Sequence, residues 1–133
     1  FFIKSFLPKN WKLKPMHNLN EKQIFYNLSR SKIFLSFSNM EGLGIPPIEA
    51  AIAGNKVIGY PGRGGYEYWK KPIFTEIQHG NLSKFVKEIF LSIKKNKLNK
   101  NLSKARKRII NQYSLKQEKD KLANMIKKIN KIM

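Results

Sequence analysis

The sequence predicts an α/β fold in which a parallel sheet is flanked by helices and followed by a helical C-terminal segment. Short apolar runs at residues 33–37 and 56–60 enclose a segment with helix start and stop signals, an order typical of parallel sheets. Beyond residue 83, apolar side chains recur at helical spacing. A chain of 133 residues without cysteine can build one core without disulfides. We therefore expect residues 1–133 to form a single domain.

The first helix is predicted to begin after Asn20 and to end near Ser31. Asn20 is a favourable N-cap, Glu21 follows in the first turn, and Gln23 completes a capping box. The apolar side chains of its inner face would be Ile24, Phe25 and Leu28. Upstream of this helix we expect a short strand near residues 12–14.

Residues 33–60 predict a strand, a helix and a second, parallel strand. The first strand is apolar at nearly every position, as in strands that helices cover on both faces. Pro46 and Pro47 favour a helix start, because proline lacks an N–H that the first turn leaves unpaired anyway. Gly54 favours the end of this helix. Residues 73–77 would form the last strand.

Three helices are expected after the sheet. The first would be capped by Ser83, the second would span about residues 102–112, and the third would follow Ser114, with Gln117 completing a capping box. The apolar residues of the third helix are Leu122, Met125, Ile126, Ile129 and Ile132.

The net charge of +19 comes from 27 basic and eight acidic residues, and only four of the basic residues are arginine. A lysine, asparagine and isoleucine excess is typical of AT-rich genomes and requires no partner; an anionic partner is the alternative. Nucleic acid is disfavoured, because its sequence readers use arginine and interleaved aromatics. Residues 33–69 sum to −1, the rest of the chain to +20, and residues 84–133 to +13. The lysine excess is therefore absent from one window.

That window contains two glutamates, Glu41 and Glu49, with seven residues between them. A carboxylate can accept two hydrogen bonds side by side, which matches the vicinal diol of a ribose or hexose. We expect Glu49 in the first turn of its helix and Glu41 on the preceding loop, so that both face a cleft at the carboxyl edge of the sheet. Stabilisation of the helix dipole is the alternative explanation for Glu49.

The glycines between them suit close contact with a ligand. Gly42 and Gly44 let the backbone approach without a Cβ clash. Because Pro46 and Pro47 offer no N–H, an anion would be held by the amides of residues 42–45 or by those of Ile48 and Glu49. Plain turn geometry is the alternative.

A second glycine-rich loop, residues 61–65, follows the second strand at the same edge. Its Arg63 is a further candidate contact for an anion, with an ordinary exposed loop as the alternative.

Together these segments resemble a known family. The run from Glu41 to Ala51, with residues 53–58, looks like the donor-binding signature of retaining GT-B glycosyltransferases of the group 1 type. Residues 59–69 are similar to the glycine-rich segment that follows this signature in some members, and residues 110–115 resemble a late helix junction. The resemblance covers about residues 17–130. It implies a Rossmann-like sheet forming part of a GT-B C-terminal domain, the domain that binds a nucleotide-sugar.

The resemblance also implies roles. Glu41 would be the catalytic residue that contacts the transferred sugar, and Glu49 would hold the ribose hydroxyls. The donor-binding set would be Gly42, Leu43, Gly44, Ile45, Glu49, Arg63, Gly64 and Gly65. Leu43 stands where an aromatic residue is common. The donor would be a UDP- or GDP-linked hexose, transferred with retention to a glycan or polysaccharide acceptor, with no cofactor and no obligatory metal.

Two parts of the family pattern have no counterpart here. The first strand–helix unit, which supplies an arginine and a lysine to the leaving diphosphate, is unmatched, and so is the acceptor-binding N-terminal domain. The chain also begins with Phe1 rather than Met. We therefore expect a fragment that is inactive alone and needs the missing domain or a partner chain. Its place would be cytoplasmic, in bacterial polysaccharide synthesis, with the basic C-terminal helices able to contact the inner membrane face.

Two other functions remain open. The chain could be a non-catalytic remnant or interaction domain of the same fold, or a basic module for membrane or nucleic acid. No apolar run reaches the roughly 18–20 residues of a membrane span. His17 and His79 are far apart, and no cluster has metal-ligand spacing.

Overall fold

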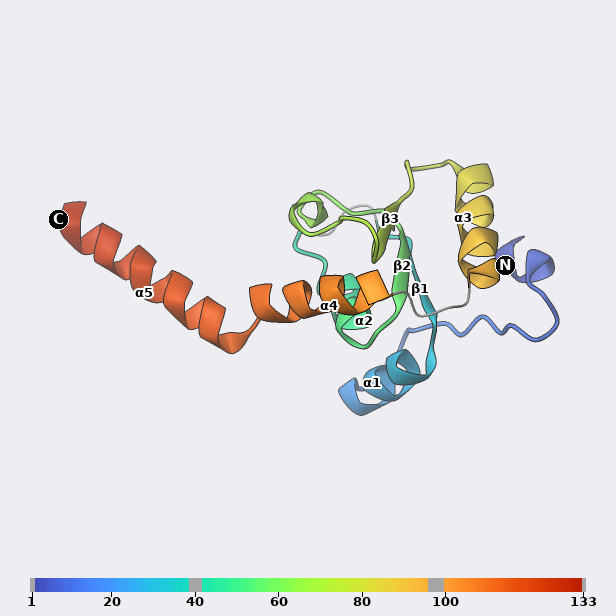
Figure 1. Ribbon diagram of the computed structural model, residues 1–133, viewed down its shortest axis with the longest axis horizontal. Coiled ribbons are helices and arrows are strands. Elements are labelled where there is room, and N and C mark those ends of the chain that lie inside the picture. Colours follow the sequence, from blue (N-terminus) through green and yellow to red (C-terminus); the bar gives the residue numbers. More distant parts are fainter. Residues whose placement is uncertain (1, 39–41, 96–99, 133) are drawn as a thin grey trace.

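The computed structural model describes residues 2–38, 42–95 and 100–132. Figure 1 shows the body of the molecule around a small sheet, with the last helix projecting from it. The elements, in chain order, are the 3-10 helix η1 (Phe2–Phe6), α1 (Glu21–Arg30), β1 (Ile33–Ser36), α2 (Ile45–Ile52), β2 (Lys56–Gly59), the 3-10 helix η2 (Gly65–Glu67), β3 (Phe74–Glu76), α3 (Leu82–Lys94), α4 (Lys100–Gln112) and α5 (Leu115–Ile132).

The sheet is parallel and has the order β1-β2-β3. Ser36 pairs with Gly59, and Gly59 pairs with Glu76, so the three strands end in one row. The α/β fold with a parallel sheet is thereby confirmed, and each observed strand lies within its predicted range. Residues 12–14 belong to no strand, so that prediction was wrong.

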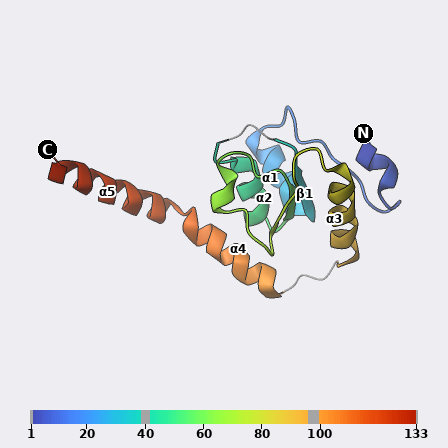
Figure 2. The ribbon, with the colours of Figure 1, turned by 90° about the horizontal axis from the view of Figure 1, so that it is seen from above.

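Helices cover both faces of the sheet, as Figure 2 shows for α2 and α3 on opposite sides of β1. On one face, α1, α2 and α4 enclose a core around Val57 and Phe74. On the other, α3 and η1 pack on Ile58 and Ile77. Successive side chains of a strand point to opposite faces. This burial on both sides explains the nearly continuous apolar runs of the strands.

The predicted capping box of α1 is confirmed. The Gln23 N–H donates to Asn20 Oδ1 at 2.9 Å, and the Asn20 N–H donates to Gln23 Oε1 at 3.0 Å. Leu28 is buried and Ile24 packs beside it. Phe25, in contrast, is 70% exposed, so its assignment to the inner face was wrong. Adjacent helical residues are about 100° apart, and the face that α1 turns to the core contains Ile24, Asn27 and Leu28 instead.

The later helices agree with the sequence except at one start. Asn81, not Ser83, caps α3, because its side chain accepts from the Lys84 N–H at 3.0 Å. The start of α5 is as predicted, with Ser114 Oγ accepting from the Gln117 N–H at 3.3 Å. α4 packs on α2, and Arg106 Nε donates to the Ile52 carbonyl at the end of that helix.

A close backbone approach fixes the carboxyl edge of the sheet. Gly59 has a φ of 147°, and a Cβ at this position would lie 1.9 Å from the Ser36 carbonyl oxygen. The same oxygen accepts from the Tyr60 N–H at 3.0 Å, and Ser36 Oγ donates to the Tyr60 carbonyl at 3.2 Å. Only glycine permits both this conformation and this distance.

Gly59→Ala should destabilise the fold by about 3 kcal/mol or more, because backbone strain and a clash with backbone act together. Gly80→Ala is the matched control: Gly80 has a φ of 82°, but a Cβ added there would meet no atom within 4 Å. It should lose only about 1–2 kcal/mol from strain alone. Urea unfolding measures both values. Equal losses would mean that the approach of Gly59 to Ser36 is not what excludes a side chain.

Lys56 is half-buried at the start of β2, at the edge of the sheet opposite to the carboxyl edge. Its Nζ donates to the Pro72 carbonyl oxygen. Burial lowers the pKa of Lys56 from 10.5 to about 8; the Glu88 carboxylate opposes this shift, and the ammonium groups of Lys71 and Lys95 add to it. The protonated form is therefore disfavoured in the folded protein.

This shift predicts how stability depends on pH. Between pH 8 and 10.5 the unfolded chain holds more of this proton than the folded chain, so Lys56 should make stability rise with pH across this window. Lys56→Met should remove that rise and increase stability below pH 8, where the penalty is fully present. Lys22→Met, at an exposed position on α1, is the control. Urea unfolding at several pH values tests this, and parallel curves for Lys56→Met and the parent chain would contradict it.

Candidate functional site

The candidate site lies at the carboxyl edge of the sheet, where β1, β2 and β3 end in register. The loops that leave these strands therefore emerge side by side. The first leads into α2, the second contains residues 61–65, and the third leads to α3. In parallel α/β sheets this edge is where ligands bind.

The start of α2 restricts which backbone groups can contact an anion. Gly44 is the N-cap, in a left-handed conformation with φ 66° and ψ 67°. Pro46 and Pro47 occupy the first turn and donate nothing. The amides of Ile48 and Glu49 lie within the helix, where the carbonyls four residues earlier are their acceptors. Among the described residues of this segment, the amides of residues 42–45 remain for a ligand.

The two glycine-bearing segments of the predicted site are in direct contact. A Cβ at Gly64 would lie 2.3 Å from the Gly42 carbonyl oxygen and 3.1 Å from the Leu43 nitrogen. The Tyr68 hydroxyl donates to the Gly44 carbonyl oxygen at 2.8 Å. Tyr68 is itself buried against Phe74 and Tyr113. The core thus holds the loop of residues 61–65 against the entry to α2.

Glu49 is placed differently from the prediction. α2 begins at Ile45, so Glu49 is its fifth residue and lies beyond the first turn, which contains no acidic residue. The helix starts earlier than expected because Gly44, rather than a residue nearer the prolines, forms the N-cap. The dipole explanation for Glu49 is weakened, since that effect fades after the first turn. Its side chain is exposed. Glu41 lies outside the described residues.

The remaining predicted residues are accessible at the same edge. Arg63 is exposed and lies between the buried Gly62 and the half-buried Gly64. Leu43 and Ile45 are also exposed. Tyr66, which follows the loop, is the third large hydrophobic residue exposed here. The surface here combines one guanidinium with apolar side chains.

Sequence reasoning missed three residues at this edge. Glu76 ends β3 in the row with Gly59, and the His79 ring lies 5.1 Å from that of Tyr60. Both could have been found, because polar residues at the end of a parallel strand share the edge with the other loops. Tyr68 could not, since its partner Gly44 is 24 residues away and no spacing rule links them.

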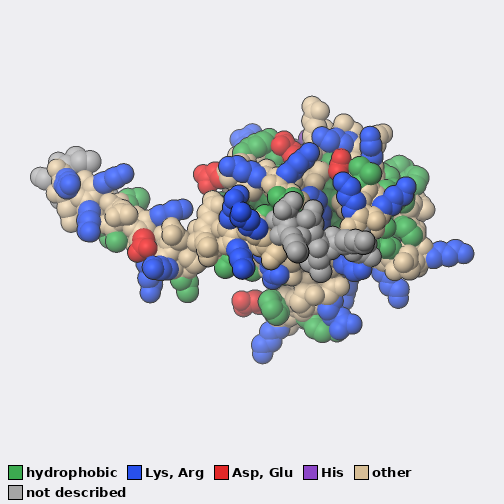
Figure 3. Space-filling view, in the orientation of Figure 1, with side chains coloured by type: hydrophobic (Ala, Val, Ile, Leu, Met, Phe, Trp, Pro, Cys, Tyr) green, Lys and Arg blue, Asp and Glu red, His purple; other side chains and the backbone are tan. Residues whose placement is uncertain are grey.

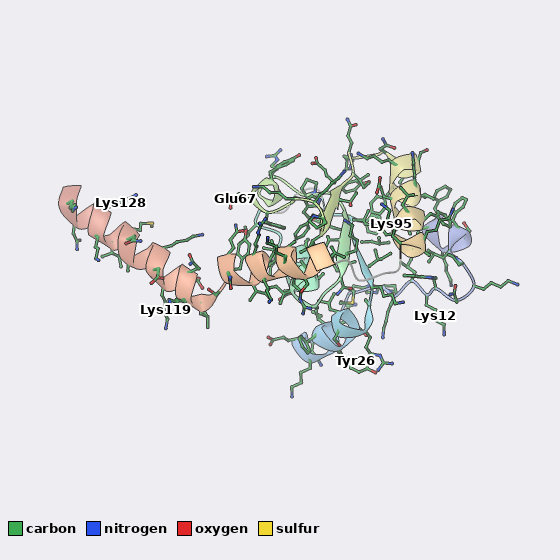
Figure 4. The ribbon with its side chains drawn as sticks, in the orientation of Figure 1. Lys12, Tyr26, Glu67, Lys95, Lys119 and Lys128 are labelled. Carbon is green, nitrogen blue, oxygen red and sulfur yellow. The ribbon has the colours of Figure 1, made fainter. Side chains whose placement is uncertain are left out.

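Tyr113 connects α4 to this region. Burial, and then the Glu67 carboxylate, raise the pKa of Tyr113 above its usual value. Glu67 belongs to η2, which directly follows the glycine-rich loop (Figure 4). Tyr113, directly after α4, therefore links the end of that helix to Tyr68 through a ring contact.

Within the described ranges, no group of three or more His, Cys, Asp or Glu side chains is arranged to hold a metal ion. No helix among the same residues combines the length and apolar character needed to cross a bilayer. No protein-family model, curated protein or solved structure matches the chain.

Gly64→Ala tests the contact between the two segments. The added methyl must push residues 42–43 away, so amide NMR signals of residues 42–45 should shift and stability should fall by about 1–3 kcal/mol. Gly65→Ala is the matched control, because its nearest neighbour would be Pro61 Cβ at an ordinary 3.4 Å. It should leave those signals in place. Identical spectra for the two variants would show that the segments do not touch.

Proposed function

We propose that this chain is the nucleotide-sugar-binding part of a retaining GT-B glycosyltransferase. The observation that carries the proposal is the contact between residues 42–44 and 64–68 at the carboxyl edge of a parallel sheet. These are the two segments whose sequences resemble the family's donor site. They are separated along the chain, and a donor-binding role requires them to be adjacent.

The chemistry of the edge suits a nucleoside diphosphate sugar. The amides of residues 42–45 and the Arg63 guanidinium offer donors to the diphosphate or sugar. The exposed Glu49 carboxylate can accept hydrogen bonds from both hydroxyls of a ribose. Because Gly64 and Gly65 have no side chains, a ligand can come close to the backbone of this loop. Glu41 is proposed to contact the transferred hexose as the catalytic residue.

The shape of the sheet supports an incomplete domain. A doubly wound sheet consists of two halves that meet at a switch point, and its second half runs outward strand by strand. The order β1-β2-β3 has this form. Among the described residues, β1 pairs only with β2, and a largely apolar groove of about 820 Å³ lies beside it, lined in part by Leu13, Phe34 and Leu35. In the proposed complete domain, β1 would be the strand at which the other half joins.

The proposal includes a limit on activity. Transfer requires positive charge for the leaving diphosphate and a second wall to position the acceptor. Arg63 is the basic side chain that the window 33–69 brings to this edge, since Lys56 lies at the opposite one. We therefore propose that transfer to a glycan or polysaccharide acceptor needs an N-terminal domain or partner chain, and that this chain alone binds the donor weakly.

A nucleotide titration followed by NMR tests the donor site. UDP or GDP at millimolar concentration should shift the amide signals of residues 42–45 and 63–66. Glu49→Ala should weaken nucleotide binding about 10-fold or more, because a charge-assisted hydrogen bond pair is lost. The exposed Glu21→Ala on α1 makes the same charge change elsewhere and should bind like the parent chain.

Two further ligands separate ribose recognition from attraction of any anion by a chain of charge +19. Inorganic diphosphate should bind equally to the parent chain and Glu49→Ala. A 2′-deoxynucleotide should bind both proteins with the weakened affinity that Glu49→Ala shows for the ribonucleotide. If Glu49→Ala and Glu21→Ala weaken nucleotide binding equally, or if no signal at the edge shifts, the proposed donor site is refuted.

A further inference from the structure

Helix α5 carries an apolar stripe that nothing in the described part of the chain covers. Leu122, Met125 and Ile126 are 56%, 57% and 50% exposed, although their spacing is that of a buried helix face. α5 projects away from the body in both ribbon views (Figures 1 and 2). Exposure of several large side chains on one stripe marks a surface that binds something.

The charges around this stripe are strongly biased. α5 contains six lysines against Glu118 and Asp120, a net charge of +4. At about 100° per residue, Lys121 and Lys128 flank one margin of the stripe and Lys119 flanks the other. Lys119 and Lys128 are labelled on the projecting helix in Figure 4. Glu118, in the first turn, lies on the face of the stripe one turn before Leu122, and the part of α5 from Leu122 onward contains no acidic residue.

α4 extends this basic character toward the body. Its 13 residues include five Lys or Arg and no acidic residue. Beside it, a shallow cleft of about 370 Å³ is lined by Lys71, Lys104 and Arg108 with Pro72 and Ala105. Figure 3 shows Lys and Arg side chains spread over the visible face and along α5, with few acidic ones between them. The partner of α5 should therefore carry negative charge.

A second copy of the chain fits poorly. If two α5 helices paired through Leu115, Leu122 and Met125, Glu118 would occupy a core position of the seam. Lys121 and Lys128 would then flank the seam on both copies and add positive charge along it. An anionic bilayer removes the lysine repulsion, because its headgroups neutralise the lysines while its acyl boundary receives the apolar stripe from Leu122 onward, with Glu118 left outside the inserted part.

We propose that α5 lies in the plane of an anionic membrane surface, with Leu122, Met125 and Ile126 inserted at the headgroup boundary and the flanking lysines bound to lipid phosphates. The Glu118 carboxylate is unfavourable at an anionic surface, so the inserted part of α5 begins after Glu118. This inference is independent of the proposed donor site, since it uses neither the carboxyl edge nor a nucleotide.

Co-sedimentation of the chain with vesicles tests the proposal. The chain should bind vesicles containing phosphatidylglycerol and bind poorly to phosphatidylcholine alone. Binding should fall as salt rises from about 0.1 M to about 1 M, where the Debye length shrinks from about 10 Å to about 3 Å. The double variant Leu122→Glu/Ile126→Glu should bind anionic vesicles at least about 10-fold more weakly. Phe25→Glu, at an exposed apolar position on α1, should bind like the parent chain.

A second pair of variants separates the charges of α5 from the charge of the whole chain. Lys121→Gln/Lys128→Gln should lose roughly fivefold in binding per charge. Lys9→Gln/Lys22→Gln removes the same charge elsewhere and should lose markedly less. Equal losses in the two pairs, or in Phe25→Glu and the α5 double variant, would overturn the proposal. So would an α5-dependent dimer in light scattering without vesicle binding, which would assign the stripe to a second copy.

Discussion

The approach of Gly59 to Ser36 is the constraint on which the rest of the structure depends. It locks the carboxyl ends of β1 and β2 through backbone contact, and the Ile77 N–H donates to the Gly59 carbonyl at 2.8 Å on the other side. Three strand ends are thereby fixed in one row. Because the loops leave from that row, their spacing is set by backbone geometry and not by their own side chains. The positions of small loop residues at a binding edge depend on strand ends that are fixed in this way.

The chemical character of the edge follows from the way α2 begins. Two prolines in the first turn remove donors that a helix N-terminus would otherwise offer to an anion. The loop at Gly42 and Gly44 must supply them instead, and Gly64 must stay small so that the neighbouring loop can lie against it. Tyr68 holds this arrangement from the core by its hydroxyl bond to Gly44. The site is therefore organised by backbone groups, with Arg63, Glu49 and Glu76 among its exposed charged side chains.

Local signals in the sequence were sufficient for most of the fold. Apolar runs, the Asn20 capping box and the prolines before Ile48 each depend on residues close in the chain, and each prediction of an element from them is confirmed. Errors arose where neighbours in space decide. Phe25 has an apolar side chain but is 70% exposed, and α3 is capped by Asn81 although Ser83 offered a second adequate cap. For the site, spacing predicted which loops meet but not the Tyr68 bond that joins them.

The low number of lysines in residues 33–69 is explained in large part by burial. β1, α2, β2 and the two residues after η2, Tyr68 and Trp69, supply much of the core, and lysine is almost never fully buried without a partner. Burial alone therefore keeps lysine out of most of this window. The informative positions are the exposed ones, where a drift toward lysine meets no packing constraint. Leu43, Ile45, Glu49, Tyr66 and Glu67 are exposed, and none of them is lysine. All five belong to the loops, the helix and the 3-10 turn that follow the strand ends, so these exposed positions without lysine lie where a donor is proposed to bind.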